Sequence, residues 1–499
     1  MLDTATATFY TSLLACVPLG GLYKNIENEE KRRALGTGIG ILIAIVICGP
    51  KVFYTVLLVS GNIIVIKCCD KRFVHKMSLS FTWMFLLYLY FHIGCTKYAG
   101  WLFQTLSLRL VGLAFEINIY DQTTSNTESK SKTEKSAPHK VPASLPDEKV
   151  TQLSAADIAT YAFFFIGIHK GPYYTWKSFN DHLNSTVSVQ GDFWVVTGQK
   201  LRKTFLLTLG YFALRSNYPI SIYEDDEFYT NYGTDYRFLF CMPQLVIYYL
   251  ESQIILMITT SACSGAGFGV YPVKSMAVPG AGPTKPVVGP ELPPDKEEYN
   301  FSMLKCFDNE KILMGPKMKD TIRGWDMATR YWFAQYIVKN LINNNFEVRS
   351  ACSFLLWTIW TGSTIQDTIM AMTLWVYIHL ESDYSQLYSE SLTGPWDLGF
   401  AIMRILCLCY LTPCLIIEDW AVALRYYNSI YWVYHIVLGV LTVAAIAIDK
   451  SRTRVKLISN AETLKGIPVP AGKSKTDDVA PSKPEGITQD SEPSTSGNK

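Results

Sequence analysis

Asp326 and Thr361 are two polar residues that could do chemistry inside an otherwise apolar part of the chain. Asp326 opens an aromatic segment, and Thr361 lies in the stretch IWTGS, which interrupts the apolar run 351–380. A carboxyl group removed from water has a raised pKa and can act as a general base. A threonine hydroxyl donates a hydrogen bond but has no basic lone pair near neutral pH. The two residues therefore predict a small polar site that orients a substrate or handles a proton.

A helical hairpin is predicted to bring these two residues together. An aromatic amphipathic helix follows Asp326, asparagines at 343–345 supply a turn, and the apolar run begins at Ala351. The turn lies near the midpoint between Asp326 and Thr361, and at about 1.5 Å per residue each arm is roughly 26 Å long. The two side chains are therefore expected to return to similar depth in a bilayer.

The composition is that of a membrane protein. The 499 residues are 49% hydrophobic and 18% charged, with a mean hydropathy of +0.13. The net charge of +2 gives no indication of a nucleic acid partner, and none is expected. The twelve cysteines form no CxxC pair and no pattern with histidine at zinc spacing, so they are interpreted as small buried hydrophobes and no metal site is predicted.

Apolar windows that could cross the hydrocarbon core recur along the chain, and we expect about ten or eleven passes in one membrane domain. Glycines within the windows are expected to let neighbouring helices approach closely. The windows are 7–23, 34–50, 52–69, 77–100, 102–119, 155–171, 203–222, 237–262, 350–380, 396–418 and 426–448.

Polar stretches divide these windows into regions. The prolines and glycines of 272–300 are expected to forbid regular structure, and basic residues directly after the last window favour the cytosolic side. The predicted division is N-terminal membrane helices in 1–120, a mobile polar loop in 121–150, central membrane helices in 151–271, a Pro/Gly-rich loop in 272–324, the hairpin and C-terminal membrane helices in 325–448, and a disordered cytosolic tail in 449–499.

Several charged residues lie inside the windows. Arg109 and Glu116 are two helical turns apart, so they share a face, and that face is expected to look inward because isolated charges are costly in lipid. Each charge taken singly is explained by an ion pair or by snorkelling to the head groups. Together they favour a membrane-embedded cavity; the others are Glu251, Arg404, His435 and the Asp419/Arg425 pair.

The segments GWDMATRYWFAQYIVK and VRSACSFLLWTIWTG resemble the signature of the membrane-bound O-acyltransferases, in which Trp-Asn or Trp-Asp is followed further on by Trp-His-Gly. They are most similar to the lysophosphatidylinositol acyltransferase branch, the type 7 members. The matching pieces ICGPKVF, IGIHKGPYYTW, SGAGFGVYPV and LRYYNSIYWVYH extend the likeness from the first window to the last.

The resemblance implies an all-α multi-pass membrane protein whose helices enclose an internal tunnel, in the endoplasmic reticulum membrane. It implies transfer of an acyl chain from acyl-CoA to a lysophospholipid, most directly lysophosphatidylinositol, as in phospholipid remodelling. Acyl-CoA is then a co-substrate, and no cofactor is expected. Residue by residue, the resemblance places Asp326 at the family Asn and Thr361 at the family His, both catalytic, with substrate-binding residues Trp325, Arg330, Gln335, Trp360 and Gly362 beside them.

The chain departs from the family pattern at both catalytic positions. Aspartate for asparagine is the milder change, whereas threonine for histidine removes a general base, which typically costs about 10²–10⁴ in rate. His169, His379 and His435 are interpreted as hydrogen-bonded interior or interfacial residues rather than substitutes. A purely structural interpretation of IWTGS also stands, in which the threonine bonds back to its own helix and the glycine lets a helix approach.

Three functions therefore remain open. The first is an acyltransferase whose partners are acyl-CoA, a lysophospholipid and the bilayer, with Asp326 acting as base through a water. The second is a catalytically silent relative that binds acyl-CoA or lipid and acts through partners. The third is a transporter-like conduit, which has only the buried charges in its favour and no internal sequence repeat. The resemblance favours the first, and the altered catalytic pair favours the second.

Overall fold

The chain is almost entirely helical in the computed structural model, which describes residues 4–131, 148–184, 193–285, 298–341, 345–386 and 393–465. The sheet within these ranges is one antiparallel pair, β1 (Tyr271–Pro272) with β2 (Tyr299–Asn300). Residues 1–442 form one compact unit, and the chain from 443 belongs to a second. The predicted all-α class is confirmed.

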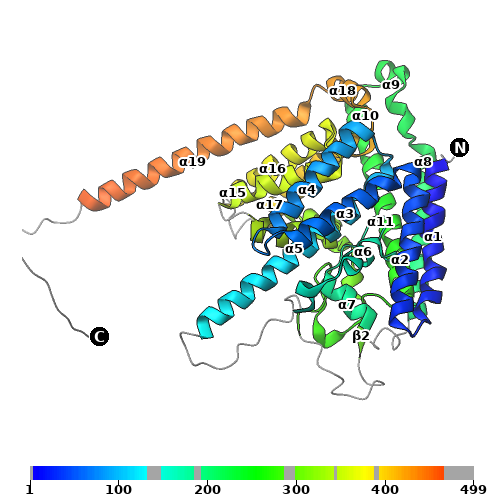
Figure 1. The fold of residues 1–499 in the computed structure, drawn as a ribbon. Coiled ribbons are helices and arrows are strands. Elements are labelled where there is room, and N and C mark those ends of the chain that lie inside the picture. The colour runs from blue at the N-terminus through cyan, green and yellow to red at the C-terminus, as the bar shows by residue number, and fades with distance from the viewer. Residues whose placement is uncertain are drawn as a thin grey trace, which may run out of the picture. The chain divides into compact units, whose positions relative to one another are not determined.

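Seven long helices form the N-terminal and central part of the first unit. Helix α1 packs on α2 and α11, α11 packs on α8, and α4 packs on α5, as Figure 1 shows. The helices are α1 (Thr4–Lys24), α2 (Glu29–Cys48), α3 (Val52–Cys68), α4 (Val74–Tyr88), α5 (Lys97–Ser131), α8 (Phe193–Asn217) and α11 (Cys241–Gly265).

Shorter helices and the C-terminal hairpins complete the fold. Helices α15, α16 and α17 lie in succession, each packed on the next (Figure 1). The elements are α6 (Ala155–Phe163), α7 (Trp176–Asn184), α9 (Asp226–Asn231), α10 (Thr234–Leu239), α12 (Asn309–Met314), α13 (Met318–Gly324), α14 (Met327–Trp332), the π-helix η9 (Phe333–Leu341), α15 (Phe346–Thr361), α16 (Ile365–Ser385), α17 (Thr393–Ile416), α18 (Trp420–Ser429) and α19 (Val433–Lys465).

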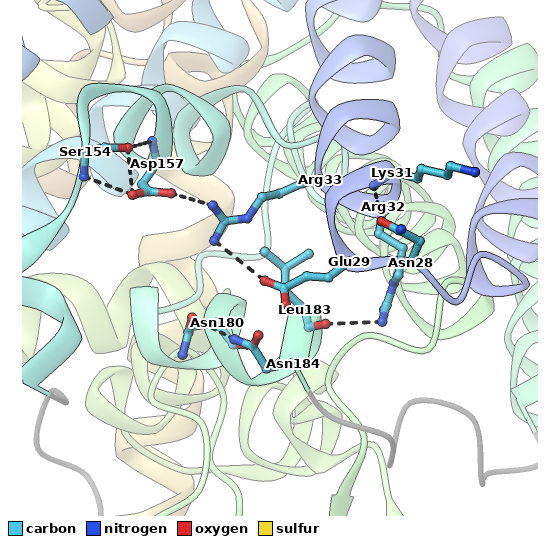
Figure 2. Close-up of polar contacts among 10 residues, drawn as sticks. All are labelled: Asn28, Glu29, Lys31, Arg32, Arg33, Ser154, Asp157, Asn180, Leu183 and Asn184. Atoms are coloured by element: carbon cyan, nitrogen blue, oxygen red, sulfur yellow. Dashed lines mark hydrogen bonds and ion pairs between the residues drawn. The ribbon is translucent and has the colours of Figure 1, made fainter.

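Polar caps set where α2 and α6 begin, and an ion pair joins the two helices (Figure 2). The Asn28 side chain accepts from the third residue of α2 at 3.1 Å, and Ser154 with Asp157 forms a capping box at the start of α6. Arg33 of α2 then pairs with Asp157 at 2.5 Å. The adjacent Arg32 donates to a backbone carbonyl at the end of α7 at 3.4 Å. These contacts fix the start of α2 against the segment that precedes the candidate site.

Six helical segments among the described residues are long and apolar enough to cross a membrane, one of which, 29–68, contains both α2 and α3. This number is smaller than the ten or eleven predicted windows, because the other windows are short, charged or broken. Window 155–171 is helical only to Phe163. Window 350–380 is broken after Thr361, where Ser363 has a positive φ of 57°. The multi-pass membrane architecture itself is confirmed.

The described structure differs from three of the predicted regions. Helix α5 continues through 121–131, where serine and threonine hydroxyls bond back to the preceding turn, so the predicted loop does not begin at 121. Helix α19 continues through 449–465 of the predicted disordered tail. The Pro/Gly-rich region 272–324 contains β1 to β2 pairing and helices α12 and α13, because prolines and glycines limited regular structure to short pieces without abolishing it. Residues 132–147, 286–297, 342–344 and 466–499 lie outside the described residues.

Helix α5 is the centre of the first unit. Within its apolar window 89% of the residues are buried inside the protein, a larger share than in any other candidate span. Helices α2, α3, α4, α6 and α15 all pack against it. A helix so enclosed can offer polar side chains to a site that lipid does not reach.

Candidate functional site

One face of α5 forms the floor of a pocket. Trp101, Gln104, Thr105 and Leu108 follow one another at spacings of three, one and three, which places all four on the same side of a helix. The space at the pocket that protein atoms do not fill is about 360 Å³ when the solvent at its open side is included, and about 30 Å³ of it can hold the centre of a water-sized molecule. The other walls come from the loop 164–175, from the start of α14 and from the end of α15; the residues are Lys170, Gly171, Tyr173, Asp326, Thr329 and Trp360.

The two arms of the predicted hairpin therefore meet at this pocket. Asp326 comes from the first arm and Trp360, the neighbour of Thr361, comes from the second. Helix α5 is bonded to both arms, so it helps to bring them together. The internal tunnel that the resemblance implies stays a prediction.

The first arm is fixed to α5 by an indole hydrogen bond. Trp332 is fully buried and its Nε1 donates to the carbonyl of Leu108 at 2.9 Å. Asp326 caps α14: its backbone is left-handed (φ 36°, ψ 66°) and its Oδ1 accepts from the backbone N–H of Thr329 at 3.3 Å. Non-glycine residues seldom adopt this conformation, so the carboxyl group is held at the pocket by a strained backbone.

Burial sets the protonation of Asp326, which lies outside the six candidate spans. Burial raises the pKa of its carboxyl group, while the hydrogen bonds from Thr329 and the positive charge of Lys170 act in the opposite direction. The net direction is upward. Asp326 therefore has the raised pKa that the sequence predicted for a carboxyl group out of water.

The second arm is fixed to α5 at its last turn. The Nε1 of Trp360 donates to the carbonyl of Gln104 and lies within hydrogen-bonding distance of Ser107 Oγ, both at 3.1 Å. In return, Nε2 of Gln104 donates to the carbonyl of Thr361 at 2.9 Å. The hydroxyl of Tyr90 on the α4 side donates to the carbonyl of Trp360 at 3.0 Å. The position of this turn is thus determined by contacts outside α15.

The Thr361 hydroxyl is directed to its own helix. It donates to the carbonyl of Thr358, three residues earlier, at 3.0 Å, and Thr361 is not among the residues that line the pocket. A β-carbon on Gly362 would lie 3.2 Å from Oδ2 of Asp367, so the glycine accommodates the start of α16 rather than a distant helix. The structural interpretation of IWTGS accounts for the threonine hydroxyl and leaves Trp360 as the residue of this stretch at the pocket.

Three other predicted substrate-binding residues are not among those that line the pocket. Trp325 stacks on Tyr248 with ring centroids 5.9 Å apart. Gln335 accepts a hydrogen bond from Lys339 at 3.2 Å, and Arg330 lies partly buried on α14. Their contact with a substrate stays a prediction.

The histidines singled out from the sequence each have a partner and lie outside the pocket wall. His169 Nε2 is 3.1 Å from the Ser12 hydroxyl, and burial lowers the pKa of His169 to about 3. His379 Nδ1 is 2.8 Å from a backbone carbonyl one turn earlier. His435 lies between the hydroxyls of Thr373 at 3.0 Å and Tyr410 at 2.5 Å. The prediction of partnered interior histidines is confirmed for all three.

Most of the charged residues within the predicted windows are also partnered. Arg109 and Glu116 are both buried, as their shared face predicted, but backbone groups rather than each other satisfy them. Glu251 pairs with Lys97 at 3.4 Å, and Arg404 donates to a carbonyl of α12 at 2.5 Å. The prediction that Asp419 and Arg425 pair with each other is wrong. Asp419 caps α18, and Arg425 pairs with Asp226 at 2.5 Å.

Sequence reasoning missed Lys170 and Tyr173 as pocket residues. Both lie in IGIHKGPYYTW, which carried part of the family resemblance but was interpreted as the end of a membrane window. A lysine between an apolar run and Gly-Pro was the available signal, since lysine is rarely buried without a partner or a function. Among the described residues no group of three histidine, cysteine, aspartate or glutamate side chains is arranged to hold a metal ion.

Comparison with known proteins finds relatives over most of the chain. The chain is 23% identical over 453 residues to the Drosophila melanogaster protein named membrane-bound acylglycerophosphatidylinositol O-acyltransferase frj, covering 88% of this chain and 92% of that protein. It is 25% identical to MBOAT7 of Mus musculus, covering 91% and 96%, and 24% identical to MBOAT7 of Homo sapiens, covering 86% and 91%. Both mammalian proteins carry the same descriptive name. No family model matches the chain.

Proposed function

We propose that this chain, a relative of the membrane-bound acylglycerophosphatidylinositol O-acyltransferases, transfers an acyl group to the free hydroxyl of a lysophospholipid, with lysophosphatidylinositol as the first candidate acceptor. The observation that carries the proposal is the pocket on α5, where Asp326 of one signature arm and Trp360 of the other share a wall. The likeness covers both arms, and the pocket wall includes Asp326 and Trp360 of the signature segments but not Thr361. The acyl donor in this proposal is acyl-CoA, and the location is the endoplasmic reticulum membrane.

The pocket supports this reaction through position and charge. A hydroxyl and a thioester held side by side in a pocket react faster because their meeting no longer costs translational entropy. Asp326 has a raised pKa and a fixed carboxyl group, so it can hydrogen-bond the acceptor hydroxyl. Trp101 and Trp360 supply flat apolar surfaces for the acyl chain or the glycerol backbone.

The test uses membranes from cells that lack their own lysophosphatidylinositol acyltransferase and express this chain. These membranes receive labelled arachidonoyl-CoA and a panel of lysophospholipids that differ only in the head group. We expect labelled phosphatidylinositol above the level of cells with empty vector, and its loss in Asp326→Ala. Product with every head group alike would contradict the choice of lysophosphatidylinositol.

A catalytically silent relative is the second candidate, and the Thr361 hydroxyl favours it, because that hydroxyl is bonded to Thr358 and does not line the pocket. The same assay separates the two. Absence of product from the natural chain together with product from Thr361→His, alone or with Asp326→Asn, supports a silenced site that still binds both substrates. Product from the natural chain rejects it.

A further inference from the structure

Lys170 is the one basic side chain among the described residues that line the pocket, and Asp326 is the one acidic side chain. The Nζ of Lys170 lies 3.7 Å from the ring centroid of Trp101, which is also in the wall. Among the described residues Nζ contacts this indole ring and makes no hydrogen bond or ion pair within the usual distances. Its hydrogens, and in the free amine its lone pair, are therefore not taken up by another polar group of the described structure.

A clamp holds the loop that carries Lys170. Arg109 on α5 is fully buried and its guanidinium donates to the carbonyls of Ala162 at 2.9 Å and Phe164 at 2.8 Å, and also to that of Ile166. The hydroxyl of Tyr174 donates to the same Ile166 carbonyl at 3.1 Å. These bonds satisfy a buried, non-helical backbone that would otherwise be costly. The loop is thus a fixed support for the amine rather than a mobile connection.

The surroundings of Lys170, which lies outside the six candidate spans, favour the free amine more than water does. Burial lowers the pKa of Lys170 to about 8, and the charge of Lys97 on α5 acts in the same direction. Glu251 on α11 and Asp326 at α14 oppose this, and the Trp101 face also favours the ammonium form. His169 beside it is neutral near pH 7. The free amine is therefore a larger fraction of Lys170 near neutral pH than of a lysine in water.

We propose that the free amine of Lys170 accepts the proton of the acceptor hydroxyl. In the family signature a histidine stands where this chain has Thr361, and the threonine hydroxyl is not a base near neutral pH. This inference rests on the proposed acyl transfer. The hydroxyl oxygen attacks the thioester carbonyl carbon and its proton passes to Nζ of Lys170. The new carbon–oxygen bond forms and the carbon–sulfur bond breaks. The ammonium then returns the proton to the departing thiolate, which leaves as a thiol, and the carboxylate of Asp326 stabilises the transient ammonium.

The other groups near the pocket fit this task less well. An imidazole with a pKa of about 3 is a weak base, and His169 lies outside the wall with its Nε2 next to Ser12. Asp326 uses Oδ1 to cap α14, so taking up a proton would weaken the bond that orders the start of that helix. Lys170 has no such competing contact in the described structure.

Lys170→Arg separates a proton acceptor from a simple positive charge. Arginine keeps the cation and its contact with tryptophan but does not give up its proton in proteins. We expect kcat to fall by about 10²–10⁴-fold while KM stays within about threefold, as removal of a general base requires. The matched control is Lys97→Arg, because Lys97 contacts the same indole at 5.3 Å from outside the pocket wall. It should leave kcat within about twofold.

The pH dependence of kcat distinguishes the loss of a base from misfolding of the variant. In the natural chain kcat should rise with pH to a midpoint near 8, the pKa of Lys170. This rise should be absent in Lys170→Arg. Lys170→His should recover part of kcat with a midpoint at lower pH, since free imidazole titrates near 6.5. Activity of Lys170→Arg equal to that of Lys97→Arg overturns the inference.

A second readout needs no turnover. Purified protein is acylated with an amine-reactive reagent over a pH series, and the labelling of Lys170 is compared with that of a free lysine peptide by mass spectrometry. The Lys170 midpoint should lie near 8, against about 10.4 for the peptide, and lysophosphatidylinositol with a thioether analogue of acyl-CoA should protect Lys170. Such labelling without any product rejects the proposed function and keeps the reactive amine. A midpoint like that of the peptide, or no protection, rejects the inference even when product forms.

Discussion

Two regions bring polar groups into apolar surroundings at this pocket, the loop 164–175 and the helix break after Thr361, and they use those groups in opposite ways. In the loop, Arg109 takes up the backbone carbonyls, which leaves the Lys170 side chain directed to the pocket wall. At the break, the carbonyl of Thr358 accepts from the backbone N–H groups of Gly362 and Ser363 and also from the Thr361 hydroxyl. One region has its backbone satisfied by another element, and the other by its own backbone together with its own side chain.

This difference shows where to look for chemistry in a membrane protein. A polar residue inside an apolar run marks a site only when its hydrogen-bonding capacity is not already used by the local backbone. Thr361 fails this condition, although the family signature aligns it with a catalytic residue. Lys170 meets it without being part of the two-residue signature. The comparison can be tested by removing the support of each region in turn.

The largest effect is expected from Arg109→Met, which breaks the support of the loop. Methionine has similar bulk but no donors, so the carbonyls at 162 and 164 lose their Arg109 partner, while that at 166 keeps the Tyr174 hydroxyl. Leaving two buried carbonyls without this donor should lower the free energy of unfolding on the order of 3 kcal/mol. Thermal unfolding in detergent, followed by tryptophan fluorescence, measures this loss.

Arg33→Met is the matched control for that change. Arg33 ties α2 to α6 through Asp157 at 2.5 Å (Figure 2), but its side chain is 31% exposed. Ion pairs of this kind contribute at most about 1 kcal/mol. Equal losses for the two arginines would mean that the loop does not depend on its buried clamp.

Gly112→Ala tests the contact between the loop 164–175 and the first signature arm. A β-carbon on Gly112 would lie 2.5 Å from the Tyr173 hydroxyl and 3.0 Å from Nε1 of Trp332. Overpacking of this kind typically costs about 1–3 kcal/mol. It should also lower transferase activity, because Tyr173 lines the pocket and Trp332 docks α14.

Gly100→Ala on the same helix gives the opposite sign. Nothing lies within 4 Å of a β-carbon at Gly100, so the substitution meets no neighbour. Alanine stabilises a helix by up to about 1 kcal/mol relative to glycine. We therefore expect a small gain in unfolding temperature here and a loss at Gly112. A gain at both positions would show that the contact with Tyr173 is loose.

Much of this architecture follows from local sequence. The apolar windows predicted where most of the long helices lie. A segment in an apolar environment must pair its backbone N–H and C=O groups, and a helix pairs them within the segment. The hairpin argument predicted that Asp326 and Thr361 return to similar depth; the pocket wall contains Asp326 and Trp360, the neighbour of Thr361, but not Thr361 itself. The aromatic segment after Asp326 was predicted to form an amphipathic helix, and Trp332 of that segment donates the hydrogen bond that fixes the first arm to α5.

The remainder depends on contacts between distant segments. Window 155–171 was interpreted as a membrane span because Phe163 to Ile168 is apolar, yet the backbone there leaves the helix. The guanidinium of Arg109, more than fifty residues earlier, satisfies carbonyls of that loop, and the Tyr174 hydroxyl and backbone bonds such as that from Phe165 to Gly36 satisfy other polar groups of its backbone. Sequence spacing within one segment contains no information about such a partner. For the same reason the role of α5 as the shared wall, and of Lys170 in it, became visible only in the fold.

The smallest effect is expected from Thr361→Val, which tests the other side of the comparison. Valine keeps the shape of threonine and removes only the hydroxyl that bonds to the Thr358 carbonyl, so the expected cost is at most about 1 kcal/mol, with kcat within about twofold. Thr368→Val is the matched control, since its hydroxyl makes the same kind of backward bond to the Thr364 carbonyl at 3.0 Å on α16, outside the pocket wall. Equal small effects in the two variants mean that both hydroxyls serve their own helices. A fall in kcat confined to Thr361→Val, with unfolding unchanged, would place the threonine hydroxyl in the reaction and would reverse the roles assigned to the two regions.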